Sequence, residues 1–386
     1  MESNNNELSP HQDATEEKIS HDKHSIGSKS TNSNDNVHSA SELPGDHATE
    51  NANSGFFRTP NGTFIEIRDV WASNLDEEME NIRNIIELYP YVAMDTEFPG
   101  VVARPVGDFG DLQFQTLRCN VDMLKLIQLG LSFTDKDGNW VNIEGCRCTC
   151  WQFNFKFSLS GDMFAQDSIE LLQSSGIDFE KFENYGIDVQ YFGELLMMSG
   201  LVLNDEIKWV SFHSSYDFGY LLKTLTCTDL PMDEPAFMEL LLTYFPSIYD
   251  VKYMMTAVEG MHGGLSSLAD FLQIERIGPM HQAGSDSLLT AQTFFALINK
   301  HFGGQCDDSK FRGELFGLGS NHTKYKTKGY SASSGSSSSS SSTGPQQLQY
   351  NPAVHHPLGS ALSVNNNNNN VLQTAGGAGF GYDEGY

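Results

Sequence analysis

Four acidic residues from both halves of the chain lie in apolar or small-residue surroundings: Asp95, Glu97, Asp217 and Asp286. Burying a single ionised carboxylate there carries a large desolvation penalty unless an opposite charge compensates for it. Divalent cations provide that compensation when several carboxylates share them. The chain is therefore expected to fold so that these separated segments meet at one metal-binding place.

Asp95 and Glu97 lie two residues apart in the extended segment 91–98. Side chains two apart on a strand point to the same face, so both carboxylates converge on one spot. Hard oxygen ligands suit Mg²⁺ or Mn²⁺ better than Zn²⁺, and two such ions can stabilise the attacking and the leaving oxygen of a phosphoryl displacement. The acidic pair therefore predicts phosphodiester hydrolysis. The alternative for this pair alone is a solvated strand with two unrelated acids.

Asp217 follows the β-prone segment 208–213 and precedes residues 218–223, whose apolar spacing suits a helix. It is therefore expected at a strand-to-helix transition, where amide groups of the helix start favour its charge. The alternative is an acid that only caps the helix.

His281 and Asp286 open the strongly periodic stretch 287–298, so Asp286 is expected in the first turn of a long helix. Gly278 and Gly284 allow the preceding loop to turn, so that His281 can reach the acids. A histidine titrates near neutral pH and can take a proton from an attacking water. The alternative is a capping or core histidine.

The chain order Asp-x-Glu, Asp, His-x4-Asp is that of the DEDDh group of 3′-to-5′ exonucleases, which have a ribonuclease H-like fold. The surrounding sequence resembles the Caf/Pop-type deadenylases, catalytic subunits of the Ccr-Not complex, from about Ile65 to Gly319. The segments that carry this resemblance are 94–105, 151–155, 165–172, 216–220 and 276–286.

The resemblance implies a function for each matched residue. Asp95, Glu97, Asp217 and Asp286 match the metal-binding acids, which hold two Mg²⁺ or Mn²⁺ ions, and His281 matches the residue that acts on the attacking water. The implied activity is 3′-to-5′ shortening of poly(A) tails with release of AMP, which promotes mRNA decay and translational repression. The implied partners are poly(A) RNA, the Not scaffold and a second deadenylase subunit, in the cytoplasm and nucleus.

Phe98 directly follows the acidic pair, which suggests a surface on which the terminal base stacks. A phenylalanine beside a buried strand is as readily a core residue. Both interpretations of Phe98 are open at this point.

The order of elements predicts a single α/β domain with a mixed sheet flanked by helices. The segments 124–133 and 151–155 are separated by the turn 135–138, which indicates antiparallel strands. Later strands alternate with helices, which adds parallel pairing. This arrangement is what a ribonuclease H-like fold requires.

Composition divides the chain into three parts. Residues 1–55 form an acidic Asn- and Ser-rich arm with too few apolar residues for a core, 56–319 form the exoribonuclease domain, and 320–386 form a low-complexity Ser-, Asn- and Gly-rich tail. No apolar run suits a signal peptide or a membrane span, so we expect a soluble protein in a reducing compartment.

The net charge of −27 excludes binding of RNA through a global positive field. A short 3′ end needs only a narrow site with a few cations nearby, for which Lys125, Arg104 and Lys252 are candidates. We therefore expect weak intrinsic RNA affinity and recruitment by partner proteins.

Cys146, Cys148 and Cys150 alternate in a Gly-containing region. They lack the Cys-x2-Cys spacing of common zinc sites, so reduced structural thiols are the default interpretation and metal binding is the alternative.

Two other functions compete with the ribonuclease. One is a catalytically silent scaffold of the same complex, which the presence of the four acids and His281 disfavours. The other is a DNA exonuclease of the same fold, because the acids alone do not distinguish RNA from DNA.

Overall fold

The computed structural model describes residues 55–58, 64–106, 111–142 and 149–319, and the backbone of 347–350 and 354–355. Apart from Gly55, the predicted arm lies outside the described residues, as does most of the predicted tail. Cys146 and Cys148 also lie outside them. The predicted domain boundaries therefore stay predictions.

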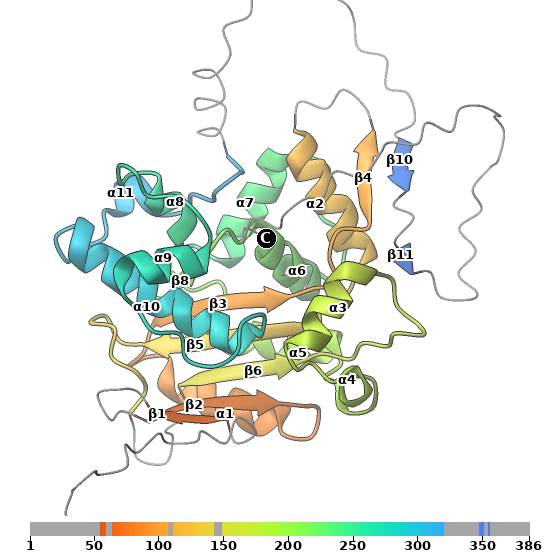
Figure 1. Ribbon diagram of the computed structural model, residues 1–386, viewed down its shortest axis with the longest axis horizontal. Coiled ribbons are helices and arrows are strands. Elements are labelled where there is room, and N and C mark those ends of the chain that lie inside the picture. Colours follow the sequence, from red (N-terminus) through yellow and green to blue (C-terminus); the bar gives the residue numbers. More distant parts are fainter. Residues whose placement is uncertain are drawn as a thin grey trace, which may run out of the picture. The chain divides into compact units, whose positions relative to one another are not determined.

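Strands and helices alternate through the described part (Figure 1). The strands are β1 (Phe56–Arg58), β2 (Phe64–Val70), β3 (Tyr91–Glu97), β4 (Ala103–Val106), β5 (Gln128–Thr134), β6 (Cys150–Asn154), β7 (Phe164–Ala165), β8 (Lys208–Ser211), β9 (Ile248–Asp250), β10 (Gln347–Tyr350) and β11 (Val354–His355). The helices are α1 (Leu75–Ile85), α2 (Leu112–Met123), α3 (Gln166–Ser174), α4 (Phe179–Tyr185), α5 (Val189–Met197), α6 (Ser215–Thr226), α7 (Glu234–Tyr244), α8 (Val251–Met255), α9 (Leu265–Leu272), α10 (Ala283–His301) and α11 (Asp308–Phe311).

The central sheet is mixed, as the sequence predicts. Its seven strands follow the order β1-β2-β6-β5-β3-β8-β9. The pairs β1–β2, β6–β5 and β5–β3 are antiparallel, whereas β2–β6, β3–β8 and β8–β9 are parallel. The predicted antiparallel pairing of the strands around the turn 135–138 is confirmed by β5 and β6.

Helices cover both faces of this sheet, because β3, the neighbour of the middle strand β5, is apolar on both sides. Val92 and Met94 belong to the large core formed with α1, α2, α5, α6 and α7. Ala93 belongs to a second core formed with α8, α9 and α10. In Figure 1 the long cyan helix α10 crosses the face of the sheet at β3 and β5, which it contacts extensively. The predicted ribonuclease H-like arrangement of a mixed sheet flanked by helices is confirmed.

Helix α1 shows how local sequence sets the boundaries of an element. It begins after Asn74 and carries Asp76, Glu77 and Glu78 in its first turn, where their charge is favourable. It ends before Pro90, which lacks the N–H that a helix interior needs. The chain then enters β3 directly.

Two short strands lie within the segment that the sequence assigns to the tail. β10 pairs antiparallel with β4, and β11 pairs antiparallel with β7. Both partners are short strands outside the central sheet.

No helix in the described ranges has the length and apolar character needed to cross a bilayer.

Candidate metal centre

The acidic pair lies at the end of β3, as predicted. Asp95 and Glu97 alternate with Met94 and Thr96, so they share the face of Ala93, which contacts the helical layer containing α10. Both acidic residues are half-buried.

The first turn of α10 brings Asp286 to this face, and two glycines permit the close approach. Gly130 on β5 lies opposite Asp95 in the strand register. A Cβ atom on Gly130 would lie 1.9 Å from the carbonyl oxygen of Ala283. A Cβ on Gly284 would lie 2.8 Å from Ile67 Cγ2. The absence of both side chains therefore lets the helix start rest against the sheet beside the acidic pair.

Two glutamines hold the helix start in this position. The first amide groups of a helix have no partner within the helix and need one elsewhere. Gln128 Oε1 accepts from the N–H of Ala283 at 3.2 Å, and Gln152 Oε1 accepts from the N–H of Gly284 at 3.0 Å. Sequence reasoning missed these residues, whose signal is weak: two amides inside otherwise apolar strands.

Three of the predicted acids form a compact cluster. Carboxylate oxygens of Asp95, Glu97 and Asp286 lie within 4.8 Å of one another, which suits a single cation. Asp217 and His281 are not members of this group among the described residues. The structure thus brings three of the five predicted residues to one point and places the other two farther out.

Asp217 lies in the first turn of α6, at the predicted strand-to-helix transition, and its side chain is tied to β3. Its Oδ1 accepts hydrogen bonds from the backbone N–H of Thr96 at 2.9 Å and from the Thr96 hydroxyl at 2.7 Å. Thr96 stands between the two acids of the pair, so Asp217 is held next to the cluster from the other side of the strand.

Burial and mutual repulsion make the ionised cluster unfavourable without a cation. Burial raises the pKa of Asp95 well above its usual range, and the charges of Asp286, Asp217 and Glu97 raise it further. The pKa of Glu97 is raised by burial and then by Asp286 and Asp217. Burial also raises the pKa of Asp217 to about 6, although the Thr96 hydrogen bonds oppose this. Bound divalent ions would compensate the negative charge of these carboxylates.

Arg276 brings a positive charge to the cluster, and sequence reasoning missed it. It precedes α10, and its Nη1 donates to Asp286 Oδ1. Of the three expected cations, Lys125 pairs with Asp162 at 2.6 Å and Lys252 donates to the carbonyl of Gly263, whereas Arg104 is exposed on β4.

His281 lies in the loop before α10, as predicted, with a left-handed backbone (φ 58°). Phe98 packs against the main core, and its ring stacks on Tyr216 with centroids 5.2 Å apart. This contact supports a core role for one face of Phe98, and base stacking stays a prediction.

Cys150 is buried in β6, and it and the other described cysteines (Cys119, Cys227 and Cys306) are free thiols.

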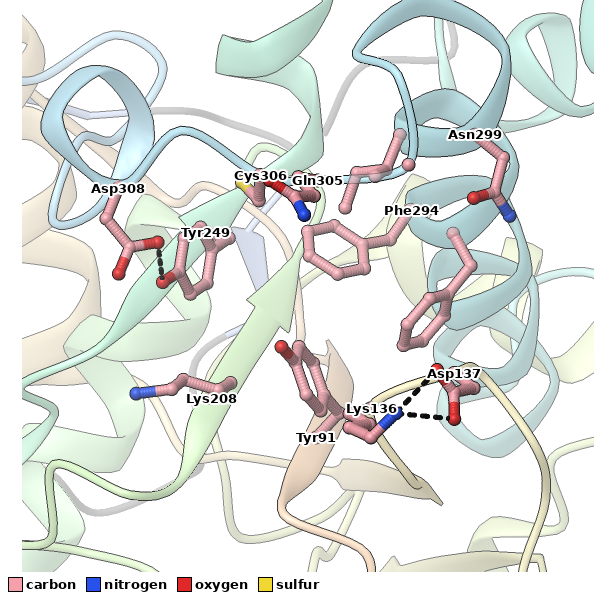
Figure 2. A pocket seen from close by; sticks show the side chains of 13 residues that line it. Tyr91, Lys136, Asp137, Lys208, Tyr249, Phe294, Asn299, Gln305, Cys306 and Asp308 are labelled. Carbon is pink, nitrogen blue, oxygen red and sulfur yellow. Dashed lines mark hydrogen bonds and ion pairs between the residues drawn. The ribbon is translucent and has the colours of Figure 1, made fainter.

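A separate cavity of about 400 Å³ opens near the other end of β3 (Figure 2). Its acids are already engaged: Asp137 pairs with Lys136 at 2.8 Å, and Asp308 accepts from the Tyr249 hydroxyl at 2.7 Å. Tyr91 in its wall is the first residue of β3, and Asp95, the nearest acid of the cluster along this strand, lies four residues or about 13 Å away. This cavity therefore does not belong to the metal centre.

Sequence comparison identifies relatives that match about two thirds of the chain. The model for the CAF1 family ribonucleases matches residues 70–195 and 196–294. The chain is 54% identical over 257 residues to the poly(A) ribonuclease pop2 of Schizosaccharomyces pombe, covering 66% of this chain and 75% of that protein. It is 52% identical over 260 residues to the probable CCR4-associated factor 1 homolog 7 of Arabidopsis thaliana, covering 66% and 94%.

Solved structures agree with this similarity. The Mg²⁺- and Mn²⁺-bound form of S. pombe Pop2p matches with a TM-score of 0.63 and 52% identity, covering 65% of this chain and 99% of that one. CAF1 co-crystallized with the yeast NOT1 MIF4G domain matches with a TM-score of 0.58 and 34% identity, covering 68% and 100%. The chain therefore belongs to the CAF1 family of ribonucleases.

Proposed function

We propose that this protein is a metal-dependent 3′-to-5′ exoribonuclease that shortens poly(A) tails and releases AMP. The observation that carries the proposal is the cluster of Asp95, Glu97 and Asp286, whose oxygens lie within 4.8 Å of one another. Carboxylates at this spacing repel one another, so their oxygen atoms and their charge both fit Mg²⁺ or Mn²⁺.

Asp95, Glu97 and Asp286 together would hold one ion, and Asp217 would complete a second position next to them. When bound, two such ions activate water and neutralise the charge that develops on the phosphate. Thr96 supports this assignment, because its two hydrogen bonds go to Oδ1 of Asp217 and leave Oδ2 as the atom that would coordinate the metal ion.

The His281 ring is the proposed proton acceptor for the attacking water. Its position in the loop directly before the Asp286 helix supports this role, because an imidazole there can act as a general base. Phe98 is the proposed surface against which the terminal base rests, with Tyr216 stacked behind it.

Poly(A) as the substrate rests on the 54% identity to a poly(A) ribonuclease. The similarity to CAF1 crystallised with a NOT1 domain supports docking on a Not scaffold of a Ccr-Not complex. The second deadenylase partner, and location in the cytoplasm and nucleus, stay predictions. A function in mRNA decay and translational repression follows from this activity.

The proposal is tested with 5′-labelled RNAs that share a body and differ in their 3′ tail, adenosine or cytidine, beside a DNA of the adenosine sequence. We expect stepwise loss of the adenosine tail in Mg²⁺ or Mn²⁺, release of AMP seen by chromatography, and no loss with chelator. Digestion of the DNA in preference to the RNA would instead identify a DNA exonuclease. A folded protein that binds Mn²⁺ yet cleaves no substrate would identify a silent scaffold.

A further inference from the structure

Arg276 lies in the connection between α9 and α10 and reaches the acidic cluster from outside. Its Nη1 donates to Asp286 Oδ1 and lies 3.4 Å from Ser285 Oγ, and its Nη2 lies 3.4 Å from Ser266 Oγ. The Arg276 and Asp286 side chains are both largely buried, with exposed fractions of 19% and 12%. The pair is therefore an ion pair of the interior, where charge interactions are strong.

The guanidinium acts on more than its direct partner. Its charge lowers the pKa of both Asp95 and Glu97, against burial and the neighbouring acids that raise them. A single positive charge thus opposes the combined charge of the clustered acids and Asp217. In the absence of a metal ion, the guanidinium thus supplies positive charge to these acids.

We infer that Arg276 is an exchangeable counter-ion, which holds Asp286 while the site is free of metal and leaves that carboxylate when a divalent ion binds. This inference rests on the proposed metal site. Its consequence is that Arg276 keeps the metal-free acidic site compatible with the fold and lowers the affinity of the site for metal.

The surroundings of Arg276 permit this exchange. Arginine cannot lose its charge in a protein, so a divalent ion at Asp286 and the guanidinium repel each other at short range. The two serine hydroxyls are 3.4 Å away, beyond the usual 2.9–3.0 Å for N–H···O, and hold the guanidinium only weakly once Asp286 is taken. Gly278 in the same connection has a φ of 88°, so this loop turns sharply just after Arg276.

The experiment compares the full chain with its Arg276→Gln, Arg276→Lys and Arg83→Gln variants. Arg83→Gln is a matched control, because it removes the same charge from an exposed ion pair with Glu80 on α1, away from the cluster. Two quantities are measured without RNA: the melting temperature in chelator, and the dissociation constant for Mn²⁺ by calorimetry.

We expect Arg276→Gln to melt at a lower temperature than the wild type in chelator and to bind Mn²⁺ about tenfold more tightly. A tenfold change is roughly the effect of one hydrogen bond to a charged group, which in this variant no longer competes with the metal ion for Asp286. Arg276→Lys keeps the charge but lacks the forked donors, so we expect a smaller increase in Mn²⁺ affinity. This variant also keeps the inference testable if Arg276→Gln fails to fold. Arg83→Gln changes neither quantity.

Mn²⁺ affinity that is unchanged or weaker in both Arg276 variants would overturn the inference while leaving the metal site intact. Weaker binding would mean that Arg276 supports the bound ion instead of competing with it. If the wild type binds no Mn²⁺, the proposed function and this inference fall together.

Discussion

The hydrogen bond from the Thr96 hydroxyl to Asp217 gives a sharp test of how the site is held. Thr96→Val removes the 2.7 Å bond to Oδ1, while the backbone N–H of residue 96 keeps its own bond of 2.9 Å. Valine has the shape of threonine and suits a strand, so the change isolates the hydroxyl.

The magnitude follows from the charge and burial of the acceptor. Thr96 and Asp217 are 5% and 8% exposed. A hydrogen bond to a charged group contributes about 1.5–3 kcal/mol, so the free energy of unfolding should fall by that amount at pH 7.5 in chelator. For a domain of this size that corresponds to a melting temperature lower by about 3–12 °C. Both quantities are measured by urea and thermal unfolding followed by circular dichroism.

Thr290→Val is the matched control. The Thr290 hydroxyl is buried in α10 and has no hydrogen-bond partner among the described residues. Replacing it with a methyl group should leave stability unchanged or slightly higher, because an unsatisfied polar group is removed. If Thr96→Val destabilises no more than Thr290→Val, the Thr96 hydroxyl does not hold Asp217 and the reasoning is refuted.

Three further predictions concern the metal centre and the residues around it. The pKa of Asp217 is raised from 3.8 to about 6, so its ionised form is disfavoured in the metal-free fold. The free energy of unfolding should therefore fall by about 3 kcal/mol as pH rises from about 4 to 7. Urea titrations should show a smaller loss in Asp217→Asn. Gly130→Ala should lower stability by about 1–3 kcal/mol and weaken Mn²⁺ binding, because the new methyl meets the Ala283 carbonyl at 1.9 Å; an unchanged melting temperature would contradict this packing. Saturating Mn²⁺ at about 100 times its dissociation constant should stabilise the wild type by about 2.7 kcal/mol, and Asp95→Asn should lose most of this gain in calorimetric scans.

The sequence predicts the position of each acid because local patterns determine it. The apolar run before Asp95 and Glu97 indicates a strand, and the alternation of side chains then places both carboxylates on one face. Asp217 and Asp286 each precede a helical apolar period, so their positions in a first turn are also readable. The mixed sheet follows from the turn after β5 and from the alternation of later elements.

The residues that complete the site are not readable from local patterns. Gly130 matters because its register partner is Asp95 and because Ala283 passes over it, and neither fact leaves a mark near residue 130. Gln152 meets the amide of Gly284 only once the sheet and α10 are packed. Arg276 is a basic residue in a loop, and its contact with Asp286 depends on the path of that loop. Such roles depend on tertiary packing and need the structure.

The most direct test of the account is a time course of a 5′-labelled, adenosine-tailed RNA in Mg²⁺ with the wild type and with Asp286→Asn. Asparagine keeps the shape of the side chain and removes one charge from the cluster. The account predicts a ladder shortened one nucleotide at a time by the wild type, and loss of at least about 100-fold in rate in a variant that still melts cooperatively. A variant that produces the same ladder at a similar rate would show that the cluster of Asp95, Glu97 and Asp286 is not the catalytic metal site.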